Sequence, residues 1–433
     1  MSLVAGRTEA NTTGAARCWS VRGAALLAGI LLQSHGAGAV EFGHAVVGST
    51  VPDRPQPLYD PIGIRAGSFM VYPSLGVRAI YNDNIYAEPT DRKSDAIIAV
   101  QPAVYAKSLW ERHSLTARLS GDIGIFTQHS SEDYQDARAN LQGRIDIAEG
   151  SSLKIGLEGG RDHERRDSPD DARGLHPTIF YRLAPNIQWD QRFNRLSLRL
   201  TGDMEKLDFR DVQALNGAII NEDDRDRLSW DVEGRVGYDF VKSVEGFASA
   251  LYDNRNYVSA VDDRGFDRDS HGYGIFGGII LEVTGTMSAE AYAGYRRQDY
   301  KDPRLKSFGG FGGGLNLVWA PTKLTTVTVT GERVIEETTQ KLESGVFASR
   351  LSVTVDHELR RNVIITLSGR FIRRDYQGQS RTDETWQGSA GVEYKLSRHF
   401  RLRAGYTYNS RDSTAASENF EMNQAYVDLH ADY

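Results

Sequence analysis

The feature that most constrains this fold is an alternation of apolar and polar residues that recurs from about residue 69 to the end of the chain. In SLTARLSGDIGIF (114–126), Leu115 and Leu119 lie on one side and Asp122 on the other. A period of two indicates an extended strand with two unlike faces. No segment in this region has the i, i+3, i+4 spacing of an amphipathic helix. The chain is therefore expected to be all-β.

The links between these segments distinguish a soluble sandwich from a membrane barrel. Short links such as AEGSS and QRFN alternate with long ones such as RDHERRDSPDDARGLHP and RDVQALNGAIINEDDRD. Outer-membrane barrels have short periplasmic turns and longer extracellular loops, whereas a sandwich needs no such rhythm. The sequence predicts a transmembrane antiparallel up-and-down β-barrel of about 18 strands, with the first near 69–83 and the last at 420–433. An even number places both termini in the periplasm.

The strand number depends on two uncertain regions, and 16 strands is the alternative. One is the pair of strands at the start, and the other is TIFYRLAPNIQWD, where Pro185 interrupts the pattern. Aromatic residues near strand ends support a membrane barrel. Trp386 and Tyr394 bracket one apolar face, and Trp230 and Tyr238 bracket another. They predict two interface girdles, the alternative being ordinary core aromatics.

The N-terminal region predicts an exported chain. A positive segment, a short apolar run and Ala37-Gly38-Ala39 are typical of a secretory signal peptide covering residues 1–39; the alternative is a buried helix. The only cysteine, Cys18, precedes the apolar run, so it is not a lipoprotein acceptor. Residues 40–68 form a Pro-rich periplasmic segment before a barrel at 69–433. A disordered leader is the favoured reading, and a partner-binding segment or a plug is the alternative.

Charged residues of both signs occupy the face opposite the apolar one. Membrane barrels are apolar outside and polar inside, so these residues are expected to line the lumen. They could pair into a rigid network or line a wet channel, and their mixture of signs suits a hydrated, hydroxyl-rich solute. The residues placed inward by parity are Arg118, Asp122, Arg144, Asp146, Lys154, Glu158, Arg199, Asp203, Glu205, Asp231, Glu233, Arg235, Glu290, Arg296, Arg370, Glu393, Arg401 and Arg403.

Motifs for catalysis or metal binding are weak. The sequence has no G-x-S-x-G or H-E-x-x-H. His163, with Asp167, Asp170 and Asp171, could form an acid/base or metal site, but a solvated charged loop is favoured. Asn82-Asp83-Asn84 could bind calcium, but a turn explains them as well. No catalytic residue, metal or cofactor is expected, and the chain is not expected to be an enzyme.

Two further features complete the sequence-based picture. GGFGGG at 309–314 lies inside a strand pattern and marks a bend or a place where side chains must be absent from the lumen. The net charge is -7 with both signs interspersed, which predicts no nucleic-acid partner.

The chain ends in FEMNQAYVDLHADY, where Val427, Leu429, Ala431 and Tyr433 alternate on one face. This face is expected to contact outer-membrane lipids. The pattern resembles the C-terminal signal by which the barrel-assembly machinery of bacteria receives its clients, so that machinery is a predicted partner.

Several stretches carry a family resemblance, among them DRPQPLYDPIGIRAGSFMVYPSLGV, YNDNIYA, WERHSL and GRIDI. They resemble the "putative β-barrel porin type 2" family of proteobacteria, which is associated with exopolysaccharide export. The resemblance implies an outer-membrane conduit for a surface exopolysaccharide. By fold-level analogy it also implies a periplasmic polysaccharide-export protein as partner. A general or solute-specific porin is the first alternative, and a non-conducting barrel with an enzymatic or structural role is the second.

Overall fold

The computed structural model describes residues 50–283, 285–338 and 343–433. The predicted signal peptide and the first part of the Pro-rich segment lie outside these residues. In the described part of the chain, no helix is long and apolar enough to cross a membrane.

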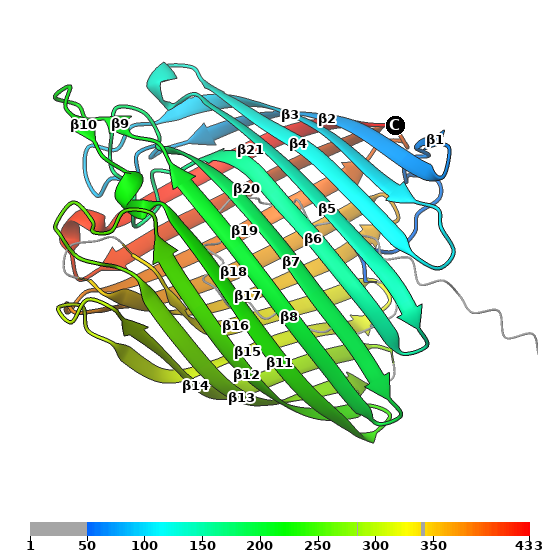
Figure 1. Cartoon of the computed structure of the whole chain (residues 1–433). Coiled ribbons are helices and arrows are strands. Elements are labelled where there is room, and N and C mark those ends of the chain that lie inside the picture. Colours follow the sequence, from blue (N-terminus) through cyan, green and yellow to red (C-terminus); the bar gives the residue numbers. More distant parts are fainter. Residues whose placement is uncertain (1–49, 284, 339–342) are drawn as a thin grey trace, which may run out of the picture.

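The described chain forms one closed antiparallel barrel of tilted strands (Figure 1). Each strand pairs with its sequence neighbours, and β21 pairs with β2 to close the ring. The 18 wall strands are β2 (Phe69–Asn82), β3 (Asp95–Ser108), β4 (Ser114–Phe126), β5 (Tyr134–Ala148), β6 (Ser151–His163), β7 (Ile179–Phe193), β8 (Leu196–Phe209), β11 (Arg227–Val241), β12 (Val244–Tyr257), β13 (Ser270–Val283), β14 (Met287–Tyr300), β15 (Phe308–Thr322), β16 (Thr325–Glu336), β17 (Gly345–Arg360), β18 (Val363–Gln377), β19 (Thr382–Lys395), β20 (Phe400–Ser413) and β21 (Phe420–Asp432).

The prediction of about 18 strands is confirmed, as are the positions of the first and last strands. Pro185 does not interrupt its strand, because it lies within β7 opposite Leu157 of β6. The short strand β1 (Ile64–Ala66) adds a hairpin to β2. Within one long loop, β9 (Val212–Gln213) pairs with β10 (Ile219–Ile220). Single 3-10 turns lie in three loops, namely η1 (Ser130–Glu132), η2 (Asp223–Arg225) and η3 (Ala416–Glu418).

The two ends of the barrel differ in the length of their connections. At the short-turn rim, two residues join β5 to β6 and two join β7 to β8. At the long-loop rim, residues 164–178 join β6 to β7 and residues 210–226 join β8 to β11. In Figure 1 the C-terminus and β1 lie at the short-turn rim, and β9 and β10 lie at the long-loop rim.

The two faces of the wall have the chemistry of a membrane barrel. On β11, the outward Val232 and Val236 are 42% and 52% exposed, while the intervening inward Asp231, Glu233 and Arg235 are 4–5% exposed. A soluble protein would bury the apolar set and expose the charged set. The reversed pattern fits an outer surface covered by lipid.

Outward aromatics mark the thickness of this apolar band. Trp386 and Tyr394 are 56% and 42% exposed on the outer face of β19. Eight residues separate them, which corresponds to ~26 Å along a strand and to ~20 Å along the barrel axis at a tilt near 40°. That height is slightly below the ~25 Å apolar band of an outer-membrane barrel. Val427, Leu429 and Tyr433 of the predicted assembly signal also point outward and are about half exposed.

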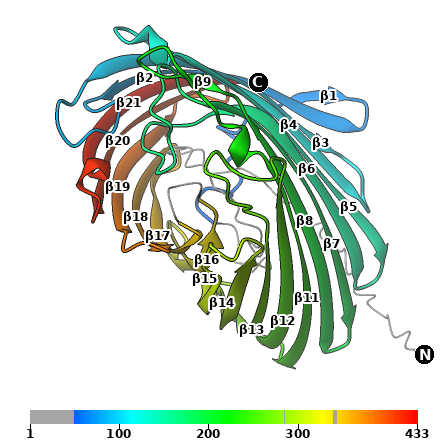
Figure 2. The same ribbon diagram turned by 60° about the vertical axis from the view of Figure 1, so that its left-hand side comes forward.

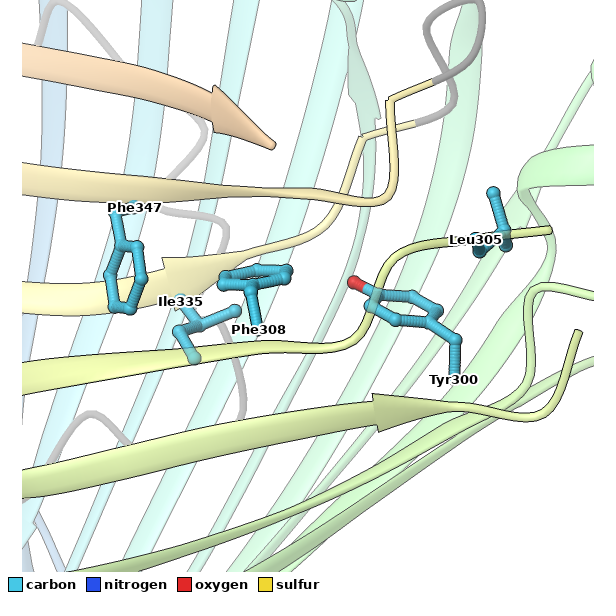
Figure 3. Packing of buried hydrophobic residues seen from close by; sticks show 5 residues of the cluster. All are labelled: Tyr300, Leu305, Phe308, Ile335 and Phe347. Atoms are coloured by element: carbon cyan, nitrogen blue, oxygen red, sulfur yellow. The ribbon is translucent and has the colours of Figure 1, made fainter. Parts of the chain in front are cut away.

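The wall overlaps itself at one place on the long-loop rim. The β15–β16 ladder begins only at Gly313 opposite Arg333, while β15 remains paired with β14 as far as Phe308. Beyond Arg333, the end of the β16–β17 hairpin passes inside β15 and β14. Figure 3 shows the apolar cluster that joins the two layers, consisting of Tyr300, Leu305, Phe308, Ile335 and Phe347. We call this place the seam.

Candidate functional site: a constriction in the lumen

The central feature of the lumen is the β6–β7 loop, residues 164–178, which we call the constriction loop. Figure 2 looks obliquely into the long-loop rim, where segments of the long loops lie inside the ring of strands. Glu164, Asp167 and Thr178 of this loop are at most 7% exposed. A barrel of this strand number would otherwise enclose an aqueous channel, so this loop occupies part of that space.

Ion pairs at its base hold the constriction loop in place. The Arg225 guanidinium donates two 2.8 Å hydrogen bonds to the Glu164 carboxylate and stacks over the Phe209 ring, with 4.0 Å between the guanidinium carbon and the ring centroid. Burial opposes ionisation of Glu164, but Arg225 and the hydroxyl of Ser168 lower its pKa below the ordinary value. The anchor therefore stays ionised at neutral pH.

The loop also contacts the far side of the barrel. Asn409 Nδ2 on β20 donates a 3.2 Å hydrogen bond to Asp167, and the Arg411 guanidinium donates to the Asp167 main-chain oxygen. Thr338, which follows β16, donates a 3.0 Å hydrogen bond to Asp170. These contacts span about half of the ring of strands, so the loop crosses the lumen.

The expectation of a solvated charged loop at His163, Asp167, Asp170 and Asp171 is wrong. Asp167 forms a bidentate pair with Arg165 at 2.8 and 2.9 Å, and the other two aspartates lie among buried loop contacts. Burial, opposed in part by Arg166, raises the pKa of Asp171 to about 7. His163 Nδ1 lies 2.9 Å from the Asp136 carboxylate, and its ring stacks on Tyr134 at 4.1 Å between centroids.

Two cavities flank the constriction loop, and Arg165 and Asp167 line both. The larger has a volume of about 170 Å³. Its walls combine aromatic rings with charged and amide groups, contributed by Arg78, Asp122, Tyr134, Asp136, Gln424 and Tyr426 among others. The smaller has a volume of about 30 Å³ and lies against β18, β19 and β20. Arrangements of this kind can bind a small polar solute by hydrogen bonds and ring contacts.

Most charges predicted to face the lumen are paired along the wall. Pairing of this kind makes the wall rigid and leaves no single sign dominant around the ring. The pairs are Arg144–Asp146 (2.8 Å), Lys154–Asp190 (3.6 Å), Arg199–Asp190 (2.7 Å), Glu205–Arg182 (2.6 Å), Arg235–Glu290 (2.8 Å), Arg296–Asp253 (3.1 Å), Arg401–Asp432 (2.6 Å) and Arg403–Glu393 (2.8 Å), with Glu158 also on Arg182 and Glu233 beside Arg235.

The remaining members of that set have other surroundings. Asp122 accepts a 3.1 Å hydrogen bond from Gln101 and lines the larger cavity. Arg370 donates a 3.2 Å hydrogen bond to Ser352 and lines the smaller cavity. Asp203 and Asp231 lie directly opposite each other on β8 and β11. Arg118 is exposed. Among the described residues, the lumen thus contains both a paired wall and the cationic side chains of Arg118 and Arg370 without an ion-pair partner.

The glycine run of β15 leaves room for rings inside the barrel. A side chain at Gly314 would meet the Tyr292 ring at 2.5 Å, and one at Gly312 would meet the Phe276 ring at 3.2 Å. The strand pattern continues through the run, so these glycines leave space on the inner wall for aromatic side chains of neighbouring strands, such as the perpendicular pair Phe276 and Tyr292.

The residues considered for calcium binding belong to a turn. The side-chain amide of Asn84 forms hydrogen bonds with the main chain of Glu88 and Glu421.

The segment before the barrel lies against the inner wall at the short-turn rim. The Val51 amide donates a 2.9 Å hydrogen bond to Thr326 Oγ1, and Arg54 pairs with Glu358 at 2.7 Å. Lys395 donates a 3.3 Å hydrogen bond to Gln56. Because Thr326, Glu358 and Lys395 belong to β16, β17 and β19, this segment follows the wall across four strands.

Sequence reasoning missed several lumen residues, chiefly Arg374 and Arg411. Both lie in stretches expected to be loops, yet β18 continues to Gln377 and β20 to Ser413. The signal was available, because Arg374 has the same parity as Arg370, and Arg411 the same parity as Arg403. The expected loops began too early because the outer face of these strand ends is also charged, as in the 2.9 Å pair of Arg373 with Glu384.

Comparison with known proteins places these observations in a family. Similar solved structures include OpdK of Pseudomonas aeruginosa, with a TM-score of 0.41, 12% identity, and coverage of 84% of this chain and 99% of that chain. OccK2 (OpdF) of the same organism has a TM-score of 0.44 and 10% identity, with coverage of 84% of this chain and 98% of that chain. A mutant of the ferric enterobactin receptor PfeA from this organism has a TM-score of 0.42 and 8% identity, with coverage of 84% of this chain and 80% of that chain. No curated protein matches the sequence. A family model described as "Putative beta-barrel porin 2" matches residues 56–433, and the chain is a member of that family of outer-membrane β-barrel porins.

Proposed function

We propose that this protein is a solute-selective porin that passes small, polar, hydroxyl-bearing or charged molecules through the outer membrane. The observation that carries the proposal is the constriction loop, which crosses the lumen and lies between two polar cavities. At about 170 Å³, the larger cavity is below the ~300–1,000 Å³ of pockets that enclose drug-sized ligands. A solute of monosaccharide size or smaller fits this space.

The contacts that hold the constriction loop across the lumen favour a porin over the exopolysaccharide conduit expected from the sequence. A polymer in transit needs a continuous passage at least one sugar ring wide. The loop is held across the lumen by Arg225 at its base and by Asn409 and Thr338 on the far side. Export would require all of these contacts to break, whereas a small solute can occupy the larger cavity beside the loop while they stay in place.

We infer the orientation of the barrel from the lengths of its connections. Outer-membrane barrels carry their longer loops outside the cell, which puts the long-loop rim outside and both termini in the periplasm. The barrel-assembly machinery and outer-membrane lipids remain the predicted partners. A periplasmic polysaccharide-export protein is not required for this function.

Reconstitution of the purified full chain tests the proposal. Planar bilayers are expected to show stepwise conductance, and liposomes are expected to swell in a monosaccharide but not in a maltooligosaccharide of several units. The absence of any conductance or swelling would refute the porin. A deletion strain provides the complementary test. The amount of exopolysaccharide in the medium is expected to equal that of the parent strain. Loss of the polymer from the medium together with its accumulation in the periplasm would instead support the export conduit.

A further inference from the structure

The smaller cavity is a candidate binding site. It has a volume of about 30 Å³ and lies between the constriction loop and the wall formed by β18, β19 and β20. A water molecule needs ~10–15 Å³ measured in this way, so the space holds about two waters or one small charged group. The residues that matter for binding are Arg165, Arg370, Arg374, Thr385, Asn409 and Arg411.

Positive charge is in excess around this cavity. Four guanidinium groups line it, and the one lining carboxylate, Asp167, is paired with Arg165. Within the described part of the chain, Arg370 has no carboxylate within ion-pair distance and hydrogen-bonds only Ser352. Arg374 pairs with Glu336 at 3.2 Å, but this carboxylate also pairs with Arg350.

Unsatisfied polar atoms give a second, independent indication of a ligand. Two groups that can donate a hydrogen bond, Thr385 Oγ1 and Arg411 Nε, are buried without a hydrogen-bond partner among the described residues. Thr385 and Arg411 are 8% and 6% exposed. Leaving such a group unpaired costs ~1–3 kcal/mol, more when it is charged. Two such donors around one small space are available to a bound acceptor group.

We propose that this cavity binds the carboxylate of a small organic anion. Guanidinium groups match a planar carboxylate through paired N–H donors, and Arg370 and Arg411 supply such donors beside the hydroxyl of Thr385. The available volume accepts a carboxylate head but not the body of the solute, which would lie in the lumen. The role of this site on the path of a permeating solute rests on the proposed porin function, whereas binding itself does not.

The primary test is equilibrium binding of ¹³C-formate to the full chain in detergent, followed by NMR line broadening. Wild-type protein is expected to give a saturable curve. Arg370→Gln and Arg411→Gln are each expected to weaken binding at least tenfold, and Arg370→Lys, which keeps the charge but loses the fork, by less. Arg144→Gln is the matched control, because Arg144 pairs with Asp146 elsewhere on the wall; it is expected to leave the formate affinity unchanged.

Three results would overturn the assignment. Wild-type protein that shows no saturable formate binding would exclude the site. Equal affinity in Arg370→Gln protein with a native β-sheet circular dichroism spectrum would place the formate elsewhere. If phosphate occupies the site at a lower concentration than formate does, the preferred ligand would be a tetrahedral anion and the assignment to a carboxylate would be wrong.

Conductance separates this inference from the proposed function. Formate binding in a protein that conducts no ions would refute the porin and support the anion site. Normal conductance without formate binding would refute the anion site alone. If both proposals hold, Arg370→Gln is expected to lower the anion-to-cation permeability ratio measured from reversal potentials in a KCl gradient.

Discussion

Release of the constriction loop is the sharpest test of how the lumen is kept narrow. Glu164 is 1% exposed and accepts two hydrogen bonds from the Arg225 guanidinium, which also donates to Glu222. Replacing one partner of a buried pair costs ~3–5 kcal/mol because the other charge is left uncompensated. Since 1.4 kcal/mol corresponds to a factor of ten, Arg225→Gln should shift the equilibrium between the inserted and released loop by ~10²–10⁴ toward release.

Single-channel recording in planar bilayers measures this shift. Arg225→Gln protein is expected to show a larger mean conductance, frequent transitions between levels, and liposome swelling in larger sugars than wild type admits. Arg173→Gln is the matched control in the same loop. Arg173 is 53% exposed in its 3.4 Å pair with Glu418, and exposed pairs contribute ~0–1 kcal/mol. Identical conductance and size cut-off in folded Arg225→Gln and wild-type protein would refute the view that this anchor keeps the lumen narrow.

Three further predictions concern pH, packing and assembly. Burial raises the pKa of both Asp171 and Glu343 to about 7. Their contribution to stability is therefore largest below the ordinary carboxyl pKa of ~4 and falls as pH rises from there through ~7, because each buried carboxyl must then lose its proton in the folded state. The frequency of transitions between conductance levels should therefore increase from pH 5 to pH 8 in single-channel recordings. A frequency that does not change with pH would contradict this, and so would a pH dependence in Asp171→Asn protein equal to that of wild type. Gly294→Ala should prevent folding because the added carbon would lie 1.9 Å from the Ile275 carbonyl, whereas Gly388→Ala has open space; equal yields of heat-modifiable barrel in gel electrophoresis would contradict the reasoning. Leu429→Arg should lower the yield of assembled protein in outer-membrane fractions, since an outward arginine costs ~2–4 kcal/mol at mid-depth, and wild-type yield would place Leu429 away from lipid.

The wall of the barrel was predictable because lipid and lumen impose opposite chemistry on alternate residues. This contrast marked segments such as Leu228 to Phe240, where every second residue except Gly234 has an apolar or aromatic side chain. The contrast fades where strands rise above the membrane. There Arg297 and Asp299 form an outward ion pair, so no period of two marks the end of β14.

The contents of the lumen were much harder to predict. Asp167 and Asp170 look like solvated loop residues in the sequence, because nothing local shows that the loop turns inward. Their partners Asn409 and Thr338 are 242 and 168 residues away in the chain. Only closure of the ring brings these positions together, so neither the constriction nor the arginine-lined cavity follows from local patterns.

The seam between β15 and β16 fixes the height of the bilayer on this side of the barrel. Within hydrocarbon, every main-chain amide and carbonyl needs a partner in the wall, because lipid supplies none. Phe308–Gly312 lack the β16 side of their ladder, so this part of the wall must lie in the headgroup layer or above it. Phe311, 62% exposed and directed outward, lies at that level with the amphipathic boundary residue Tyr295 opposite it. The overlap at the seam therefore indicates the level at which the hydrocarbon layer ends. This level follows from the hydrogen-bonding needs of the main chain and does not depend on the hydropathy of the side chains.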